Sequence, residues 1–177
     1  IKLAQLFRQA REEISDILRH TRLIFLSTDA EEAGLRGARA FARRHREELL
    51  ALPAYNFNID SIYNLKELQF LTTDINSTIR LSMEMARQCK DIAAELGYAT
   101  HLFAITPGGG GTDAAEFARI GVQATTLIGM PTSLMRDGLV YHTANDTVGH
   151  IEPAAVEASL KIALEYILRK DRELFPD

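Results

Sequence analysis

The sequence lacks three features that would each assign a protein class. No apolar run approaches the roughly 18 residues of a membrane-spanning helix, so we expect no membrane partner. The formal net charge is −4, which gives no electrostatic reason to expect a nucleic-acid partner. The single cysteine, Cys89, cannot form a disulfide within the chain. This lone cysteine slightly favours a cytoplasmic location and leaves a secreted one open, and the oligomeric state is not indicated.

The remaining composition is that of a globular domain. The 177 residues, 46% hydrophobic and 25% charged, suit a single domain with its own core. Helical periodicity alternates with short β-rich runs, which predicts a three-layer α/β/α sandwich with a mostly parallel central sheet. The expected strands are 23–27, 55–59, 101–105 and 123–128, and the expected helices are 1–20, 35–50, 74 or 76 to 96, 112 or 113 to 120, and 153–169.

Acidic and imidazole side chains follow the expected strands. Glu31 and Glu32 come after the first strand, Asp60 ends the second, Asp113 follows the third, and His142 lies in the long loop after the fourth. In open α/β sheets, ligands bind where strands end at their carboxyl edge. We therefore expect these groups to meet at one edge of the sheet.

These residue types suit a hydrolytic zinc site. Such a site needs imidazole and carboxylate ligands with one coordination position open to water. It also needs a base, which is not itself a ligand, to take a proton from that water. Adjacent carboxylates on a turn can divide the two tasks, because neighbouring side chains point in different directions. Glu32 could then face the metal while Glu31 reaches the water.

Four short motifs carry a resemblance to a known family. They are E-E-A-G-L-R-G at 31–37, N-I-D at 58–60, T-D-A-A-E-F at 112–117 and H-T-A-N-D-T at 142–147. In this order they resemble the E-E-x-G-L-x-G, N-x-D, S/T-D-x-x-x-F and H-T-x-x-D-T motifs of the aminopeptidase Y and glutamate carboxypeptidase-like zinc peptidases, a group within the di-zinc exopeptidases. One departure is Ala114, where the family commonly has histidine.

The resemblance implies a role for each matching residue. Glu31 is then the general base, Glu32 and His142 bind one zinc, and Asp60 binds a second. In the family, a water or hydroxide between the two metals attacks the scissile carbonyl of a peptide substrate. Asp146 is a candidate to steady the loop of His142. Tyr141, which directly precedes His142, is a further candidate to support the site or contact the substrate.

The free α-ammonium of an aminopeptidase substrate needs an acidic partner. The sequence offers Glu31 and Asp113 for this task and does not choose between them. Asp113 could alternatively serve only as a helix N-cap.

A second departure concerns two further family motifs, an H-x-D and a D-x-x-x-G whose aspartate bridges both metals. Nothing in the chain supplies either one. We therefore expect residues 1–177 to be the carboxyl-terminal portion of one truncated catalytic domain. By itself this portion is expected to bind zinc weakly and to hydrolyse little.

Two alternatives remain open at the level of sequence. Carboxypeptidases and glutaminyl cyclases share the scaffold, so the substrate class is less secure than the metal chemistry. A protein of another class, a binding or interaction module that kept the scaffold and lost its metals, would also lack the two motifs. The glycine run at 108–111 does not indicate a phosphate loop, because it lacks the lysine and Ser/Thr of a Walker motif.

Overall fold

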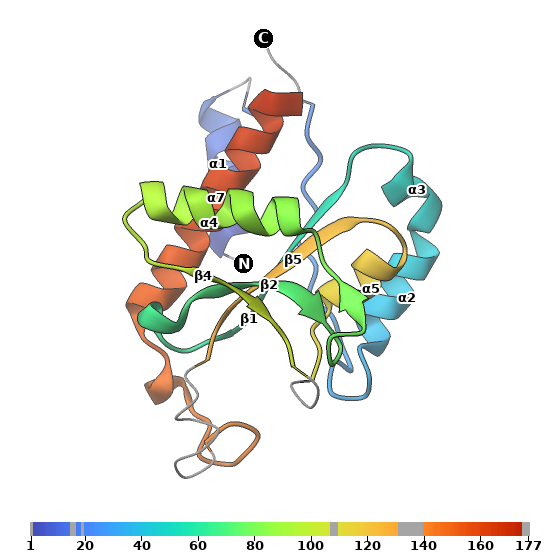
Figure 1. The fold of residues 1–177 in the computed structure, drawn as a ribbon. Coiled ribbons are helices and arrows are strands. Elements are labelled where there is room, and N and C mark those ends of the chain that lie inside the picture. The colour runs from blue at the N-terminus through green and yellow to red at the C-terminus, as the bar shows by residue number, and fades with distance from the viewer. Residues whose placement is uncertain (1, 15–16, 19, 107–109, 131–139, 175–177) are drawn as a thin grey trace.

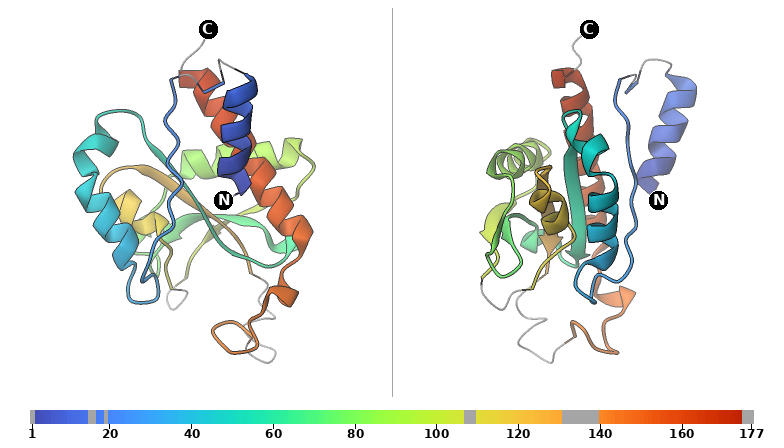
Figure 2. Two further views of the ribbon diagram at one scale, coloured as in Figure 1. Left: turned by 180° about the vertical axis from the view of Figure 1, so that it is seen from behind. Right: turned by 90° about the vertical axis from the view of Figure 1, so that its right-hand side faces the viewer.

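A computed structural model describes residues 2–14, 17–18, 20–106, 110–130 and 140–174. Its elements form three layers, with the sheet between two sets of helices (Figures 1 and 2). This confirms the predicted α/β/α sandwich. No helix in these described ranges has both the length and the apolar character needed to cross a membrane. The helical elements are α1 (Lys2–Glu13), α2 (Arg36–Arg44), α3 (Arg46–Leu50), η1 (Leu65–Glu67), α4 (Met83–Glu95), α5 (Ala114–Arg119), η2 (Val148–His150) and α7 (Pro153–Leu174).

The sheet is mixed, and its longer pairings are parallel. Its strands are β1 (Tyr55–Ile62), β2 (Gln69–Asp74), β3 (Ile79–Arg80), β4 (His101–Ala104) and β5 (Gln123–Gly129). Their order is β1-β5-β2-β3, with β4 also paired to β2. The β1–β5 and β2–β4 pairs are parallel, while β2 runs antiparallel to both β5 and β3 over short stretches.

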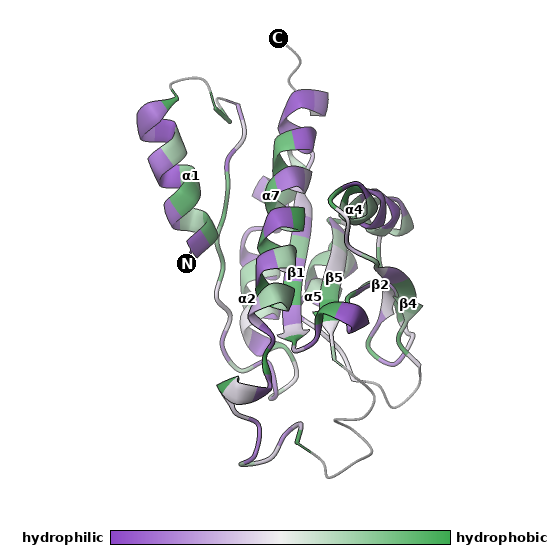
Figure 3. Cartoon of the chain, turned by 90° about the vertical axis from the view of Figure 1, so that its left-hand side faces the viewer, coloured by the Kyte–Doolittle hydropathy of each residue, from purple (hydrophilic) through white to green (hydrophobic). Residues whose placement is uncertain are grey.

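Two apolar clusters cover the sheet. Phe70 of β2 packs with α4 and α7, while its neighbour Leu71 packs with α2 and α5. This alternation follows from the period of two in a β-strand. A third cluster joins α1 to α7, and Figure 3 shows polar and apolar residues alternating along both of these helices. Cys89 lies in the first cluster, where burial raises the pKa of its thiol, as expected for a packing residue.

Several expected elements differ from the structure. The helix expected over 1–20 ends at Glu13, and the helix expected over 35–50 is divided at His45 into α2 and α3. Residues 23–27 are not a strand, and Ile24, Phe25 and Leu26 are exposed. A strand needs a hydrogen-bonded neighbour, and no described strand pairs with this segment. The helix expected from 74 or 76 begins at Met83, because residues 69–74 form the unpredicted strand β2. Ser82 provides the cap of this helix, accepting a 3.2 Å hydrogen bond from the amide of Met85.

The fold gathers four loops at one end of the molecule. The turn before α2, the end of β1, the segment before α5 and the segment before η2 all lie at the lower end in Figure 1. Each of these loops carries one of the motifs singled out in the sequence. The candidate site is therefore built from loops that the sheet brings together.

Candidate functional site

The carboxylates Glu31 and Glu32 lie on a tight turn that leads into α2. The amides of Gly34 and Leu35 both donate to the carbonyl oxygen of Glu31, at 2.9 and 2.8 Å. Leu35 has a left-handed backbone, with φ 57°. The turn therefore reverses the chain directly after the pair and presents both carboxylates at the end of the fold.

Gly37 explains the last glycine of the E-E-x-G-L-x-G pattern. A Cβ at this position would lie 2.4 Å from the carbonyl oxygen and 2.6 Å from the nitrogen of Asp29. The Gly37 amide donates to that same carbonyl at 2.9 Å. Only glycine allows the start of α2 to approach the backbone of Asp29 so closely.

His142 and Glu32 come together from distant parts of the chain. Nε2 of His142 lies 2.8 Å from Oε1 of Glu32, and the two side chains are 53% and 72% exposed. A pair this exposed contributes little to stability. The Tyr141 ring stacks on the imidazole, with ring centroids 3.8 Å apart. The loop therefore brings the two residues predicted to share one zinc into direct contact.

Electrostatics place the other predicted groups around Glu31. Burial is the largest cause of a raised Glu31 pKa, followed by the negative charges of Glu32, Asp60 and Asp113, while His142 acts in the opposite direction. Charged groups from the other three motifs therefore contribute to the electrostatic environment of the predicted base.

Asp60 lies within β1 rather than at its end. The register of β1 against β5 shifts between Ile59 and Ile62, and Ser61 has a positive φ of 48°. Such a bulge re-aims side chains and is common next to active sites. Burial raises the pKa of Asp60, and the 2.9 Å hydrogen bond from the Ser61 hydroxyl opposes this shift.

Asp113 does not act as a side-chain cap. It occupies the N-cap position of α5, but its carboxylate makes no capping hydrogen bond. Its Oδ2 accepts from the hydroxyl of Thr28 instead, and its Oδ1 is buried without a hydrogen-bond partner among the described residues. These contacts turn the carboxylate toward the segment that precedes Glu31, which favours the site hypothesis over the capping one.

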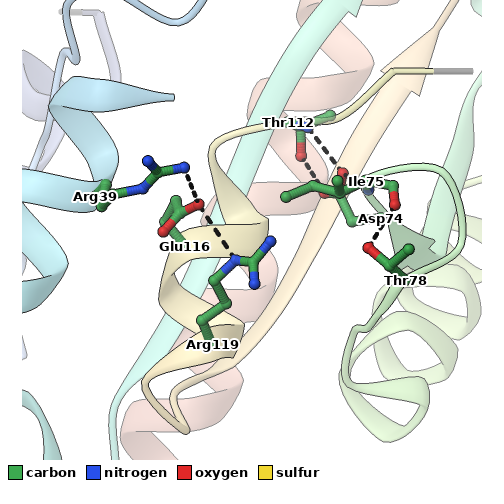
Figure 4. A network of polar contacts seen from close by, with 7 residues as sticks. All are labelled: Arg39, Asp74, Ile75, Thr78, Thr112, Glu116 and Arg119. Atoms are coloured by element: carbon green, nitrogen blue, oxygen red, sulfur yellow. Dashed lines mark hydrogen bonds and ion pairs between the residues drawn. The ribbon is translucent and has the colours of Figure 1, made fainter. Parts of the chain in front are cut away.

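Three site-supporting residues escaped the sequence argument. Tyr63 donates a 2.8 Å hydrogen bond to Asp146, the residue predicted to steady the His142 loop. Glu116, 4% exposed, binds Arg39 at 3.1 Å and thereby ties α5 to α2 (Figure 4). Asp74 is fully buried beside the segment that precedes Asp113. A polar residue inside an apolar pattern was the available signal for Glu116, whereas Asp74 has the local pattern of a turn or cap residue.

The donor chemistry of the site fits zinc, although its geometry is not that of an assembled metal centre. Carboxylate and imidazole are the groups that zinc prefers outside thiolate sites, and in the part of the chain that the structure describes the buried Oδ1 of Asp113 has no hydrogen-bond partner. Within the described ranges, however, no three His, Cys, Asp or Glu side chains are close enough together to hold one ion. Glu32 and His142, which could bind zinc, bond to each other instead.

Solved structures with a similar fold include a zinc aminopeptidase and other aminopeptidases. BSAP, a zinc aminopeptidase from Bacillus subtilis, has a TM-score of 0.62 at 20% identity, covering 81% of this chain and 34% of its own. LapA aminopeptidase from Legionella pneumophila has a TM-score of 0.63 at 14% identity, covering 84% and 38%. An aminopeptidase from Aneurinibacillus sp. strain AM-1 has a TM-score of 0.55 at 21% identity, covering 78% and 31%. The chain thus spans about a third of the length of each of these proteins.

At these identities the similarity shows the fold alone, an α/β fold shared with these aminopeptidases. No curated protein matches the chain. The family is nevertheless defined, because the model of peptidase family M28 matches residues 1–167. The chain belongs to peptidase family M28.

Proposed function

We propose that this chain contributes to the active site of a metal-dependent aminopeptidase of the aminopeptidase Y and glutamate carboxypeptidase-like group. The observation that carries the proposal is the 2.8 Å contact of His142 with Glu32, the residue next to Glu31. The negative charges of Asp60 and Asp113 also help to raise the pKa of Glu31. Hydrolysis by a metal-bound water needs a carboxylate that can act as general base, close to the imidazole and carboxylate groups that bind the metal.

In the proposed site, the residues of this chain divide the work. Glu32 and His142 would hold one zinc ion and Asp60 a second. Zinc, when bound, would polarise the scissile carbonyl and lower the pKa of a water molecule. The Glu31 carboxylate would take the proton of the attacking water at one oxygen and hand it to the nitrogen of the leaving amine. Proton transfer by a positioned side chain is typically worth about 10²- to 10⁴-fold in rate.

Asp113 is the better of the two candidates for holding the α-ammonium group of the substrate. Its Oδ1 has no hydrogen-bond partner in the described ranges, whereas Glu31 is assigned to the proton. A peptide with a free amino terminus would therefore be the substrate. Because an ammonium group donates to carboxylate oxygens, a blocked amino terminus would lose this contact.

The metal ligands of this chain are incomplete on this proposal. No H-x-D or D-x-x-x-G motif occurs in the sequence. Residues 1–177 alone would then bind zinc weakly and hydrolyse little. Two tightly held zinc ions per isolated chain would contradict this part of the proposal.

The experiment uses the full-length protein that carries this chain. We expect it to hydrolyse aminoacyl p-nitroanilides, to lose activity with a chelator and to regain it with added zinc. N-acetylated substrates should react poorly. Glu31→Gln should lower kcat by about 10²-fold or more while zinc content is unchanged, whereas Glu32→Gln should lower zinc content as well. Activity that survives both the chelator and Glu31→Gln would refute the proposal.

One observation favours a non-catalytic module as the second candidate. Glu32 and His142 satisfy each other without a metal ion. A module of this kind would bind no zinc at micromolar concentration even as the full-length protein. Equilibrium dialysis with zinc therefore separates the two candidates before any activity is measured.

A further inference from the structure

Asp74 is a buried carboxylate outside the four motifs. It ends β2 and has no exposed surface. Its Oδ1 accepts from the amides of Ile75 at 2.7 Å and Thr112 at 2.8 Å, and its Oδ2 accepts from the Thr112 hydroxyl at 2.6 Å (Figure 4). Each of these donors is neutral. Burying a carboxylate that accepts only from neutral donors is costly. We therefore expect Asp74 to have a role beyond packing.

The turn that follows Asp74 has an unusual backbone. Ile75, Asn76 and Ser77 all adopt positive φ, at 43°, 53° and 66°. For a β-branched residue such as Ile75 this region is strongly disfavoured. Strain of this kind persists only where the surrounding contacts impose it, and it gathers at functional sites.

The contacts of this turn reach Ile105, after β4, and Gly110, before α5. On one side, the Ser77 hydroxyl donates to the carbonyl of Ile105. On the other, the Asn76 amide donates to the Gly110 carbonyl at 2.9 Å, and the Gly110 amide donates to Oδ1 of Asn76 at 3.2 Å. The turn between β2 and β3 therefore binds the chain both just after β4, at Ile105, and shortly before α5, at Gly110.

Gly111 shows how closely the two segments approach. A Cβ at this position would lie 2.9 Å from Cγ1 of Ile75 and 3.3 Å from Oδ1 of Asp74. The Thr112 hydroxyl also lies 2.7 Å from the hydroxyl of Thr126 on β5. Thr112 is therefore held from β2 and from β5 at once.

This anchoring reaches the candidate site through one peptide bond. Thr112 directly precedes Asp113, whose carboxylate accepts from Thr28 and acts on Glu31. We propose that Asp74 is a positioning residue that holds Thr112, and thereby Asp113, in place at the candidate site. The inference rests on the proposed function and deepens it, because it assigns the placement of Asp113 to a residue that touches no substrate.

The test compares three variants of the full-length protein. Asp74→Ala removes every acceptor and should lower kcat by about 10²-fold, the loss that a displacement near 1 Å can cause, with KM changed less than about threefold. Asp74→Asn should restore most of kcat, because its Oδ1 still accepts and its Nδ2 can donate to the Thr112 hydroxyl. Ser82→Ala, which removes the α4 cap, is the control that loses stability and keeps kcat.

Two outcomes would overturn the inference. One is a kcat for Asp74→Ala within about threefold of the Ser82→Ala value. So small a difference, compared with the roughly 10²-fold loss expected for a displacement near 1 Å, would mean that Asp74 does not position Asp113. The other is an Asp74→Asn variant as impaired as Asp74→Ala, which would mean that charge rather than geometry matters. If Asp74→Ala does not fold, Thr112→Val takes its place, because it removes the hydroxyl donor and keeps the shape, and the same fall in kcat is expected.

Amide hydrogen exchange separates this inference from the proposed function. In Asp74→Ala, the Thr112 amide should exchange at least about tenfold faster, since its acceptor is gone, while the amides of β5 stay protected. If the wild-type protein has no peptidase activity, the proposed function is wrong. The exchange rate of the Thr112 amide then still tests whether Asp74 holds Thr112 in place. An unchanged Thr112 exchange rate would end the positioning role even in an active enzyme.

Discussion

The hydroxyl of Tyr63 donates a 2.8 Å hydrogen bond to Oδ2 of Asp146. Tyr63 follows β1 and is 8% exposed, whereas Asp146 lies in the loop that carries His142. The Tyr63 amide also donates to the carbonyl of Gly129 at 3.1 Å, and its own carbonyl accepts from Glu152 at 2.8 Å. Tyr63 therefore joins the His142 loop to the ends of β1 and β5. Burial, and then the bond to Asp146, raise the pKa of this phenol, which keeps it a donor.

Tyr63→Phe tests this link. Loss of the hydroxyl should leave the fold intact and weaken zinc binding by about tenfold, because residues that orient a ligand loop typically matter by 10- to 100-fold. Isothermal titration of the full-length protein with zinc measures the change. Tyr55→Phe is the matched control, since the Tyr55 ring packs on Tyr166 away from the site. Equal zinc affinity in both variants would contradict a role for the Tyr63–Asp146 bond.

Gly37→Ala tests the turn of Glu31 and Glu32. Its Cβ would collide with backbone atoms of Asp29 at 2.4 and 2.6 Å, so the turn must move. We expect activity to fall by more than about tenfold, as a displaced catalytic group implies. Gly97→Ala after α4 is the control, because its φ of +84° brings backbone strain but no contact within 4 Å. Comparable activity in the two variants at equal thermal stability would show that the turn tolerates the shift.

Local chemistry made much of the fold predictable. Pro153 begins α7 and Gly97, with a positive φ, follows α4, both as the sequence indicated. Pro at the first helical turn and Gly after the last follow from the backbone of each residue alone. Of the predicted site residues, Glu32 and His142 come into direct contact, although the segment before Glu32 is not a strand of the sheet.

Long-range pairing accounts for what sequence reasoning missed. Residues 23–27 have the composition of a strand, but a strand forms only where a neighbour supplies hydrogen bonds. Asp74 reads locally as a turn or cap residue, and only the position of Thr112 beside β2 shows that it is a buried acceptor. Tyr63 likewise gains its role from Asp146, more than eighty residues away. No local pattern contains these partners.

Glu116→Gln tests the link between α2 and α5. The Glu116 carboxylate is 4% exposed and bonds Arg39 at 3.1 Å and Arg119 at 3.3 Å. Hydrogen bonds between charged groups contribute more than neutral ones, so we expect Tm to fall by about 5 °C in a thermal melt. Glu95→Gln, which loses only the exposed pair with Arg169, should change Tm much less. Equal losses would mean that burial of Glu116 adds nothing.

Asp74 also predicts how stability depends on pH. Burial raises its pKa above the ordinary value, Asp60 adds to the shift, and the hydrogen bonds from Thr112 and Ile75 oppose it. A carboxyl whose pKa is raised by folding binds its proton more tightly in the folded state. Its stabilising contribution is therefore fully present below the unfolded pKa of about 3.9 and is lost as the pH rises through the folded pKa.

Asp74→Asn cannot titrate at this position, so its Tm should rise relative to the wild type as the pH increases from about 4 to 7. Calorimetric melts of both proteins across this range measure the difference. Glu95→Gln provides a control of opposite sign, because hydrogen bonding to Arg169 lowers the pKa of Glu95. The stabilising contribution of Glu95 is present above its unfolded pKa and is lost as the pH falls. The Tm of Glu95→Gln should therefore fall relative to the wild type as the pH rises. If Asp74→Asn followed the direction of Glu95→Gln, the hydrogen bonds to Asp74 would outweigh its burial.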